Sequence, residues 1–171
     1  LTGAIFLGWV QAEKVIGKIQ SGSTNTELSP AFHLGSFEMT NHRGDTVTEK
    51  TFLGKPSLYF FGFTNCPNVC PVTLGYTTAM MKKLGPDSDK LNVVFISVDP
   101  ERDTASHIAE YLKAFDGRIV GLTGTAEQTQ RTAKAFSVYY KKVPLEGGDY
   151  TMDHTASILL FDASGDFKGT I

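Results

Sequence analysis

The segment Ser57–Pro71 reads SLYFFGFTNCPNVCP and contains both cysteines of the chain. Its first seven residues are apolar or small throughout, which is typical of a central strand buried on both faces. Residues 64–67 interrupt that pattern. A helix should follow, with Pro71 near its first turn, where the missing N–H costs little, and it should end near Gly85. The segment therefore predicts a buried strand, a loop and a helix, with the cysteines at the junction.

Strand and helix patterns alternate along the rest of the chain. Residues 31–47 indicate a hairpin with its turn at 41–45. The other expected elements are a strand at 92–98, helices at about 104–115 and 125–136, a strand at 157–161 and a return arm at 166–171. This order predicts an α/β fold with a central mixed sheet, flanking helices and an added N-terminal hairpin. Open α/β sheets place their sites at the carboxyl ends of strands, where the cysteines fall.

Composition and charge narrow the class of protein. The chain has 171 residues, of which 41% are hydrophobic and 20% charged, as in an ordinary soluble globular domain. The net charge of −2 and the lack of a long basic run argue against a nucleic-acid partner. Two cysteines cannot form a disulfide scaffold, so the pair is reactive or metal-binding.

The first 30 residues differ from the remainder. Leu1–Val10 is apolar but too short to span a bilayer. It is either the end of a membrane anchor or a short helix that packs on the domain, and both interpretations stay open. Gly17–Pro30 is polar and rich in Ser, Thr and Asn, which is typical of a linker. We therefore predict an anchor stub with a linker at residues 1–30 and a folded domain at residues 31–171.

The cysteine pair has chemistry of two kinds. Cys66 and Cys70 are four positions apart, and a helix N-terminus favours the thiolate over the thiol. A thiolate is both a nucleophile and a metal ligand, so the spacing does not choose between redox chemistry and metal binding. His154 precedes the strand at 157–161, and pairing of that strand within the sheet would bring the imidazole toward the cysteines.

Two thiolates and one imidazole form a soft ligand set of low coordination number. Structural zinc sites usually have four protein ligands, and the chain has no third cysteine. Thiolates select Cu(I), and mixed sulfur–nitrogen sites also hold Cu(II). On spacing alone, however, a structural hydrogen-bonding role for His154 is the more frequent use of such a residue.

Three segments in order resemble the Sco/SenC family of cytochrome c oxidase assembly proteins. They are GFTNCPNVCP at 62–71, SVDPERDT at 97–104, and the pieces DY and DHT at 149–150 and 153–155. The resemblance implies a thioredoxin-like fold and a copper site formed by Cys66, Cys70 and His154. It departs at Asn65, where the family often has His, and at Asn68, where it often has an acidic residue.

The resemblance implies a function in copper delivery. We expect a copper-binding assembly factor that delivers copper to the binuclear copper centre of cytochrome c oxidase or prepares its thiols, rather than a conventional enzyme. The expected partners are the copper-centre subunit of the oxidase and other copper chaperones or thiol reductants, with the membrane contacted through an N-terminal anchor only. The expected location is the periplasmic face of the bacterial inner membrane, with the mitochondrial inner membrane facing the intermembrane space as the alternative.

The alternative function is a thiol:disulfide oxidoreductase in which Cys66 and Cys70 form a redox-active disulfide. Thioredoxins have two residues between their cysteines and a cis-proline facing them. Here three residues intervene, and the slot before the late strand reads Asp153-His154-Thr155. A histidine in that slot suits a metal site better than a plain reductase. A peroxidase would need an activating Thr and Arg around one attacking Cys, and that pattern is missing from the sequence.

Other polar residues have ordinary structural explanations. His33, His42 and His107 are expected to be structural or exposed. Asp103 or Thr104 should cap a helix. Asp153 either orients His154 as a neighbouring hydrogen-bonding group or points to solvent.

Two further pairs have competing interpretations. Glu101 and Arg102 are either solvated charges or partner-docking residues. Met80 and Met81 suit core packing better than a soft copper relay.

Overall fold

The central strand predicted at 57–63 is β3, Ser57–Gly62, and all six of its residues are buried. It pairs in parallel with β4, Asn92–Ser97, and antiparallel with β8, Ile158–Phe161. The computed structural model describes residues 32–171. The anchor stub and linker predicted at 1–30 lie outside the described residues, so the division of the chain near residue 31 stays a prediction.

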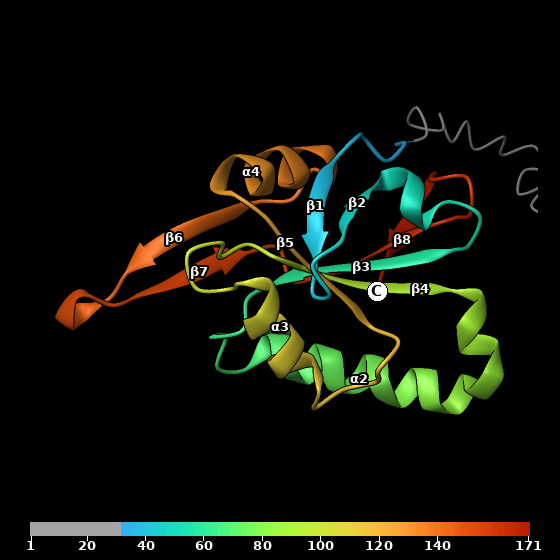
Figure 1. Ribbon diagram of the computed structural model, residues 1–171, viewed down its shortest axis with the longest axis horizontal. Helices are drawn as coiled ribbons and strands as arrows, with labels where there is room; N and C mark the ends of the chain where they lie inside the picture. Colours follow the sequence, from blue (N-terminus) through green and yellow to red (C-terminus); the bar gives the residue numbers. More distant parts are fainter. Residues whose placement is uncertain (1–31) are drawn as a thin grey trace, which may run out of the picture. The chain divides into compact units, whose positions relative to one another are not determined.

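The main sheet contains seven strands in the order β2-β1-β5-β4-β3-β8-β9, which confirms the mixed α/β class. Figure 1 shows α2 and α3 on one side of this sheet and α4 on the other. The remaining strands of the sheet are β1 (Glu38–Asn41), β2 (Thr46–Thr48), β5 (Val120–Thr123) and β9 (Phe167–Thr170), and the helices are α2 (Val69–Leu84), α3 (Ala105–Leu112) and α4 (Ala126–Ala135). Among residues 32–171, none of the helices has both the length and the apolar character that a bilayer span requires.

A separate hairpin of two strands projects from the body of the domain (Figure 1). Its strands are β6, Tyr140–Pro144, and β7, Tyr150–His154, paired antiparallel with Tyr140 opposite His154. The sequence did not predict this hairpin, because β6 has two exposed lysines and lacks a regular apolar alternation. Its last residue is the predicted ligand His154.

The two faces of β3 have different environments. Tyr59 and Phe61 contact Phe136 at the end of α4, with ring centroids 4.7 and 5.2 Å apart. Gly62 lies on the other face, against the Cys70 thiol and the Phe95 ring. The alternation of side chains along the strand therefore separates an aromatic core from the cysteine site.

The N-terminal hairpin is present but begins later than predicted. Its first arm is β1 at 38–41, whereas residues 32–37 form only an isolated bridge at His33. Leu34 and Phe37 in that segment are nonetheless buried. The apolar residues of this segment predicted a strand, but the Phe37 N–H donates to the Glu49 carboxylate, 3.1 Å away, instead of to a neighbouring strand.

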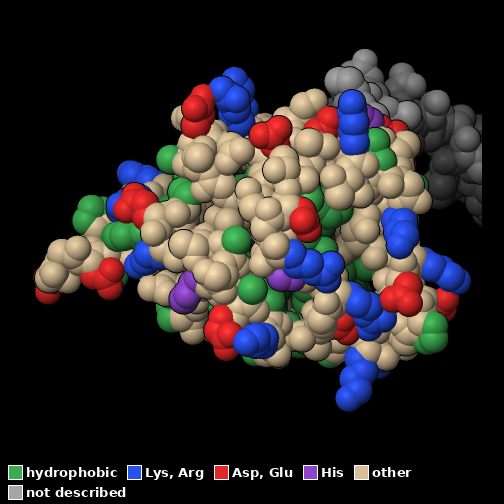
Figure 2. Space-filling model, viewed as in Figure 1, with side chains coloured by type: hydrophobic (Ala, Val, Ile, Leu, Met, Phe, Trp, Pro, Cys, Tyr) green, Lys and Arg blue, Asp and Glu red, His purple; other side chains and the backbone are tan. Residues whose placement is uncertain are grey.

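The helix caps agree with the sequence. Thr104 caps α3 by accepting a hydrogen bond from the His107 N–H. Thr125 and Gln128 form the predicted capping box of α4. Asp103, the other candidate cap of α3, is fully buried and bonds elsewhere. On the face shown in Figure 2, the described basic side chains lie among acidic ones and form no large patch of one sign.

Candidate metal centre

The three predicted ligands come from three different elements and meet at one point. Cys66 lies in the loop after β3, Cys70 in the first turn of α2, and His154 at the end of β7. One ligand atom from each residue lies within 4.8 Å of the other two. The Cys70 N–H donates to the Cys66 Sγ over 3.4 Å, and the Cys70 Sγ is 3.6 Å from His154 Nε2. The loop therefore folds back so that Cys66 faces Cys70.

The imidazole of His154 is oriented toward the cysteines. Its Nδ1 is 2.8 Å from the backbone oxygen of Thr155. A carbonyl oxygen can only accept, so the proton of the neutral ring is on Nδ1 and the Nε2 lone pair faces Cys70. The rings of Phe60 and Phe63 stand nearly perpendicular to the imidazole, with centroids 6.4 and 5.7 Å away. The site therefore presents Nε2 as a ligand without rotation of the ring.

Burial controls the protonation of Cys70. The residue is completely buried, and this desolvation raises the pKa of the Cys70 thiol well above its usual range. A backbone hydrogen bond with Phe63 lowers this pKa in part, whereas the hydrogen bond and the charge of Cys66 raise it further. Burial therefore outweighs the thiolate-favouring effect that we expected from the helix N-terminus. Burial thus favours the thiol form of Cys70 when no metal is bound, and a metal ion would displace this proton on binding.

The side chain of Tyr111 adds a buried hydroxyl near the cysteines. Its oxygen has no hydrogen-bond partner among residues 32–171. Burial is the main cause that raises the pKa of Tyr111, and the two cysteines add to the effect. The phenol therefore stays neutral and can donate a hydrogen bond.

Gly62 is required by the close approach of β3 to Cys70. A Cβ on this residue would lie 2.7 Å from the Cys70 Sγ and 2.9 Å from a ring carbon of Phe95. We expect Gly62→Ala to lower the free energy of unfolding by about 1–3 kcal/mol, because the buried thiol and ring must move. Urea unfolding measures this change. Gly75→Ala on α2 is the control: nothing lies within 4 Å of its Cβ, and it should stabilise the helix by about 0.5–1 kcal/mol. Equal stability of the two variants would contradict the close packing.

The other residues considered from the sequence lie away from this point. His33 pairs with Asp166, His42 accepts from the Gly121 N–H, and His107 is exposed. Met81 is part of the core, as predicted, and Met80 packs against it. Asp153 is exposed, and the Thr155 carbonyl makes the orienting hydrogen bond that we considered for it.

The ligand set is a soft one of two thiols and one imidazole nitrogen, and this chemistry fits copper. The sequence model of the SCO1/SenC family matches residues 25–171. The chain belongs to the SCO1/SenC family. Its neighbours in this family share the thioredoxin-like fold, which confirms the fold expected from the resemblance.

Relatives in the SCO1/SenC family include proteins of known structure. The human protein SCO1 homolog, mitochondrial, is 42% identical over 171 residues, which cover 96% of this chain and 56% of the relative. ScoI of Bradyrhizobium japonicum with copper bound is 46% identical with a TM-score of 0.78, covering 80% of this chain and 87% of that one. BsSco, described by its disulfide switch, is 25% identical with a TM-score of 0.67, covering 82% and 83%. The chain thus spans little more than half the length of the human relative.

Proposed function

We propose that this protein is a copper-binding assembly factor that delivers copper to the binuclear copper centre of cytochrome c oxidase or prepares its thiols. The observation that carries the proposal is the meeting of Cys66, Cys70 and His154 at one point, with the Nε2 lone pair facing Cys70. The copper-bound ScoI structure supports copper as the cargo. The description of BsSco as a member of a family of cytochrome c oxidase assembly proteins supports the client.

The exposure of the three ligands supports an order of copper release. Cys70 is fully buried, whereas Cys66 and His154 are only partly buried. An incoming ligand of a partner protein therefore reaches the copper from the side of Cys66 and His154. Exchange of those two ligands first and of Cys70 last would pass Cu(I) to the partner without releasing the free ion.

The proposed partners and location follow from this cargo. The acceptor is the copper-centre subunit of the oxidase, and other copper chaperones or thiol reductants supply metal or electrons. We propose that the domain works at the periplasmic face of the bacterial inner membrane, held by an anchor in residues 1–30. The alternative is the mitochondrial inner membrane facing the intermembrane space, which the name of the human relative favours. Tethering at a membrane raises the effective concentration of the domain near a membrane-bound client.

A direct transfer experiment tests the delivery function. The reduced protein, loaded with one Cu(I), is mixed with the metal-free copper-binding domain of the oxidase subunit, and the copper content of each protein is measured after separation. We expect copper to move to the oxidase domain faster than it does from a Cu(I) chelate of equal affinity. Copper that stays on the loaded protein, or transfer no faster than from the chelate, would contradict delivery.

Thiol:disulfide exchange is the second candidate function, favoured by the disulfide switch described for BsSco and by the approach of the two sulfur atoms.

We predict a reversible Cys66–Cys70 disulfide in the metal-free protein, since the sulfur atoms already lie within 4.8 Å and a small loop movement closes the bond. The oxidised protein should not take up Cu(I), because the ligands are thiolates. Thiol counting before and after reduction, followed by copper analysis, measures both effects. Equal copper uptake by the oxidised and reduced samples would refute the coupling.

A further inference from the structure

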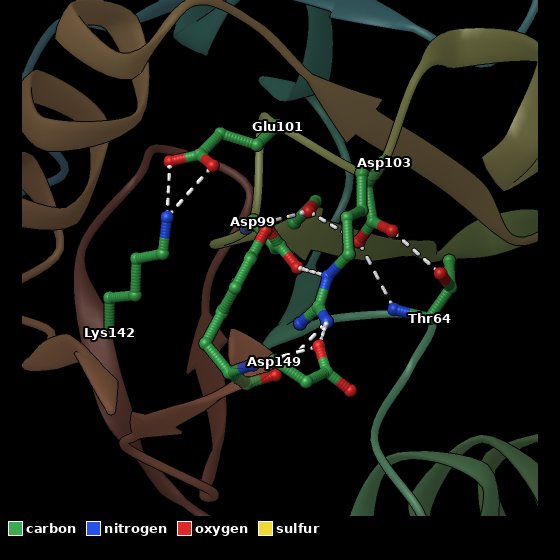
Figure 3. A network of polar contacts seen from close by, with 9 residues as sticks. Thr64, Asp99, Glu101, Asp103, Lys142 and Asp149 are labelled. Carbon is green, nitrogen blue, oxygen red and sulfur yellow. Dashed lines mark hydrogen bonds and ion pairs between the residues drawn. The ribbon is translucent and has the colours of Figure 1, made fainter. Parts of the chain in front are cut away.

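The turn between β4 and α3 contacts both segments that carry the proposed ligands. This turn, Asp99–Asp103, is part of the segment SVDPERDT, and Figure 3 shows its polar contacts. Asp103 points toward Thr64 in the cysteine loop, and Glu101 points toward Lys142 in the hairpin. Asp99 contacts the hairpin through the Tyr150 hydroxyl. The turn is therefore placed between the cysteines and the strand that ends in the histidine.

Asp103 holds the start of the cysteine loop. It is completely buried, and its carboxylate accepts hydrogen bonds from the Thr64 N–H at 3.1 Å and the Thr64 hydroxyl at 2.6 Å. The Ser97 hydroxyl at the end of β4 donates to the same carboxylate over 2.6 Å. Thr64 is two residues before Cys66. A buried carboxylate with three donors is a rigid anchor, because each lost bond would leave a polar group unpaired.

Asp99 and Arg102 hold the start of β7. Asp99 is 2% exposed and accepts from the Tyr150 hydroxyl at 2.7 Å and from Arg102 Nε at 2.5 Å. Arg102 Nη1 donates to the Tyr150 carbonyl at 3.0 Å, and the guanidinium lies 3.7 Å above the Tyr150 ring. Arg102 is thus directed into this contact rather than outward as a docking residue. Tyr150 is the first residue of β7, and His154 is its last.

The hairpin has few other polar attachments. It forms a separate two-stranded sheet, and an isolated hairpin of this size is only marginally stable. Residues 140–154 make polar contacts with three places among the other described residues. The first is Thr155 at the base of the hairpin, the second is the Cys70–His154 contact, and all the others go to the Asp99–Asp103 turn. These include the Lys142–Glu101 pair at 2.8 Å. This turn therefore supplies the polar contacts that hold the hairpin, in addition to the packing of Met152 in the core.

We propose that Asp99 and Asp103 are positioning residues that fix His154 relative to the cysteine pair. Asp103 acts on the cysteine side through Thr64, and Asp99 acts on the histidine side through Tyr150 and Arg102. The proposal rests on the proposed function, in which Cys66, Cys70 and His154 hold copper. The Asp99 carboxylate bonds to Tyr150 and Arg102 and to no residue of the cysteine loop. A change on the histidine side should therefore alter copper affinity much more than the thiol–disulfide equilibrium of the cysteines.

The test uses Tyr150→Phe, which removes the hydroxyl that bonds to Asp99 and keeps the ring. We expect its Cu(I) affinity, measured by competition with a chelator, to fall about 10- to 100-fold, as is typical when a group that orients a ligand is lost. Its Cys66–Cys70 equilibrium with glutathione, measured without metal, should shift much less than that of the cysteine-side variant Thr64→Val. Tyr139→Phe is the matched control, because Tyr139 is 55% exposed just before β6. The Cu(I) affinity of this variant should equal that of the unmodified protein.

Thr64→Val provides the complementary variant on the cysteine side. It removes the hydroxyl that donates to Asp103, so the glutathione equilibrium of the cysteines should shift by about threefold or more, together with copper affinity. Thermal unfolding of every variant identifies general destabilisation, which would move both readouts for both variants.

Two results would overturn the inference. The first is a Tyr150→Phe affinity equal to that of the unmodified protein while His154→Ala loses copper. The second is a Tyr150→Phe glutathione equilibrium that shifts as far as that of Thr64→Val. If His154→Ala itself keeps full copper affinity, it is the proposed copper site that fails, so the two failures are distinguishable.

Discussion

Replacement of Cys66 or Cys70 by alanine should reduce Cu(I) affinity by more than about 100-fold, because either variant leaves only one thiolate and one imidazole. Loss of a group that merely orients a ligand typically costs about 10- to 100-fold, so loss of the ligand itself must exceed that range. The Cys70 variant should be the weaker binder of the two. Its sulfur is fully buried, and no solvent or chelator ligand can take its place as easily as at the partly exposed Cys66. Competition with a Cu(I) chelator measures each affinity.

His154→Ala should also weaken Cu(I) binding, though less than either cysteine variant, because two thiolates remain as a competent Cu(I) pair. Its matched control is His107→Ala, which removes an exposed imidazole from α3. Both variants are tested in competition with the Cu(I) chelator. If His154→Ala binds one Cu(I) as tightly as His107→Ala does, the result would count against a three-ligand site.

The parts of the fold that the sequence predicted well are those in which one local pattern dominates. The apolar run at 57–63 produces a strand with all six residues of β3 buried, and the capping box at Thr125 starts α4 where expected. The cysteine loop follows from proline placement and from the spacing of the thiols. Each of these signals depends on neighbours within a few residues, so the local sequence is sufficient to predict the element.

The parts that escaped prediction depend on contacts between distant segments. Neither Asp103 nor Thr104 can be preferred as a helix cap from the sequence, because both side chains suit the position. Only the fold shows that Asp103 is needed by Thr64, 39 residues earlier. The hydrogen bond between Tyr150 and Asp99 spans 51 residues, and no periodic pattern in the sequence predicts it.

The same reasoning explains why His154 could be predicted as a ligand from the family resemblance but not from a local sequence pattern. Its strand, β7, has neither continuous burial nor regular alternation, and the opposing strand β6 is largely exposed. Such a hairpin holds its place through specific polar contacts and a few apolar ones, such as Met152 in the core, rather than through a regular apolar face. Specific contacts of this kind leave no repeating signal in one sequence, whereas three motifs in the right order identify the family.

His154→Ala should separate copper delivery from thiol reduction in living cells. Thiol reduction uses Cys66 and Cys70 alone, whereas copper delivery also needs the imidazole in the proposed site. In cells that lack their own SCO1/SenC protein, the unmodified chain should restore cytochrome c oxidase, and His154→Ala should leave its binuclear centre without copper. Oxidase activity and the copper content of the purified oxidase measure the outcome.

The comparison is informative only if the variant keeps its thiol chemistry, so its glutathione equilibrium must first be shown to match that of the unmodified protein. Cys66→Ala provides the reference, since it removes both functions and should fail to restore the oxidase under either interpretation. Failure of His154→Ala alongside intact thiol exchange would assign the role to copper delivery, because the only property lost is the third ligand. Normal oxidase assembly with His154→Ala would instead make reduction of the client's cysteines the main function, with the imidazole beside Cys70 serving only the structure of the hairpin.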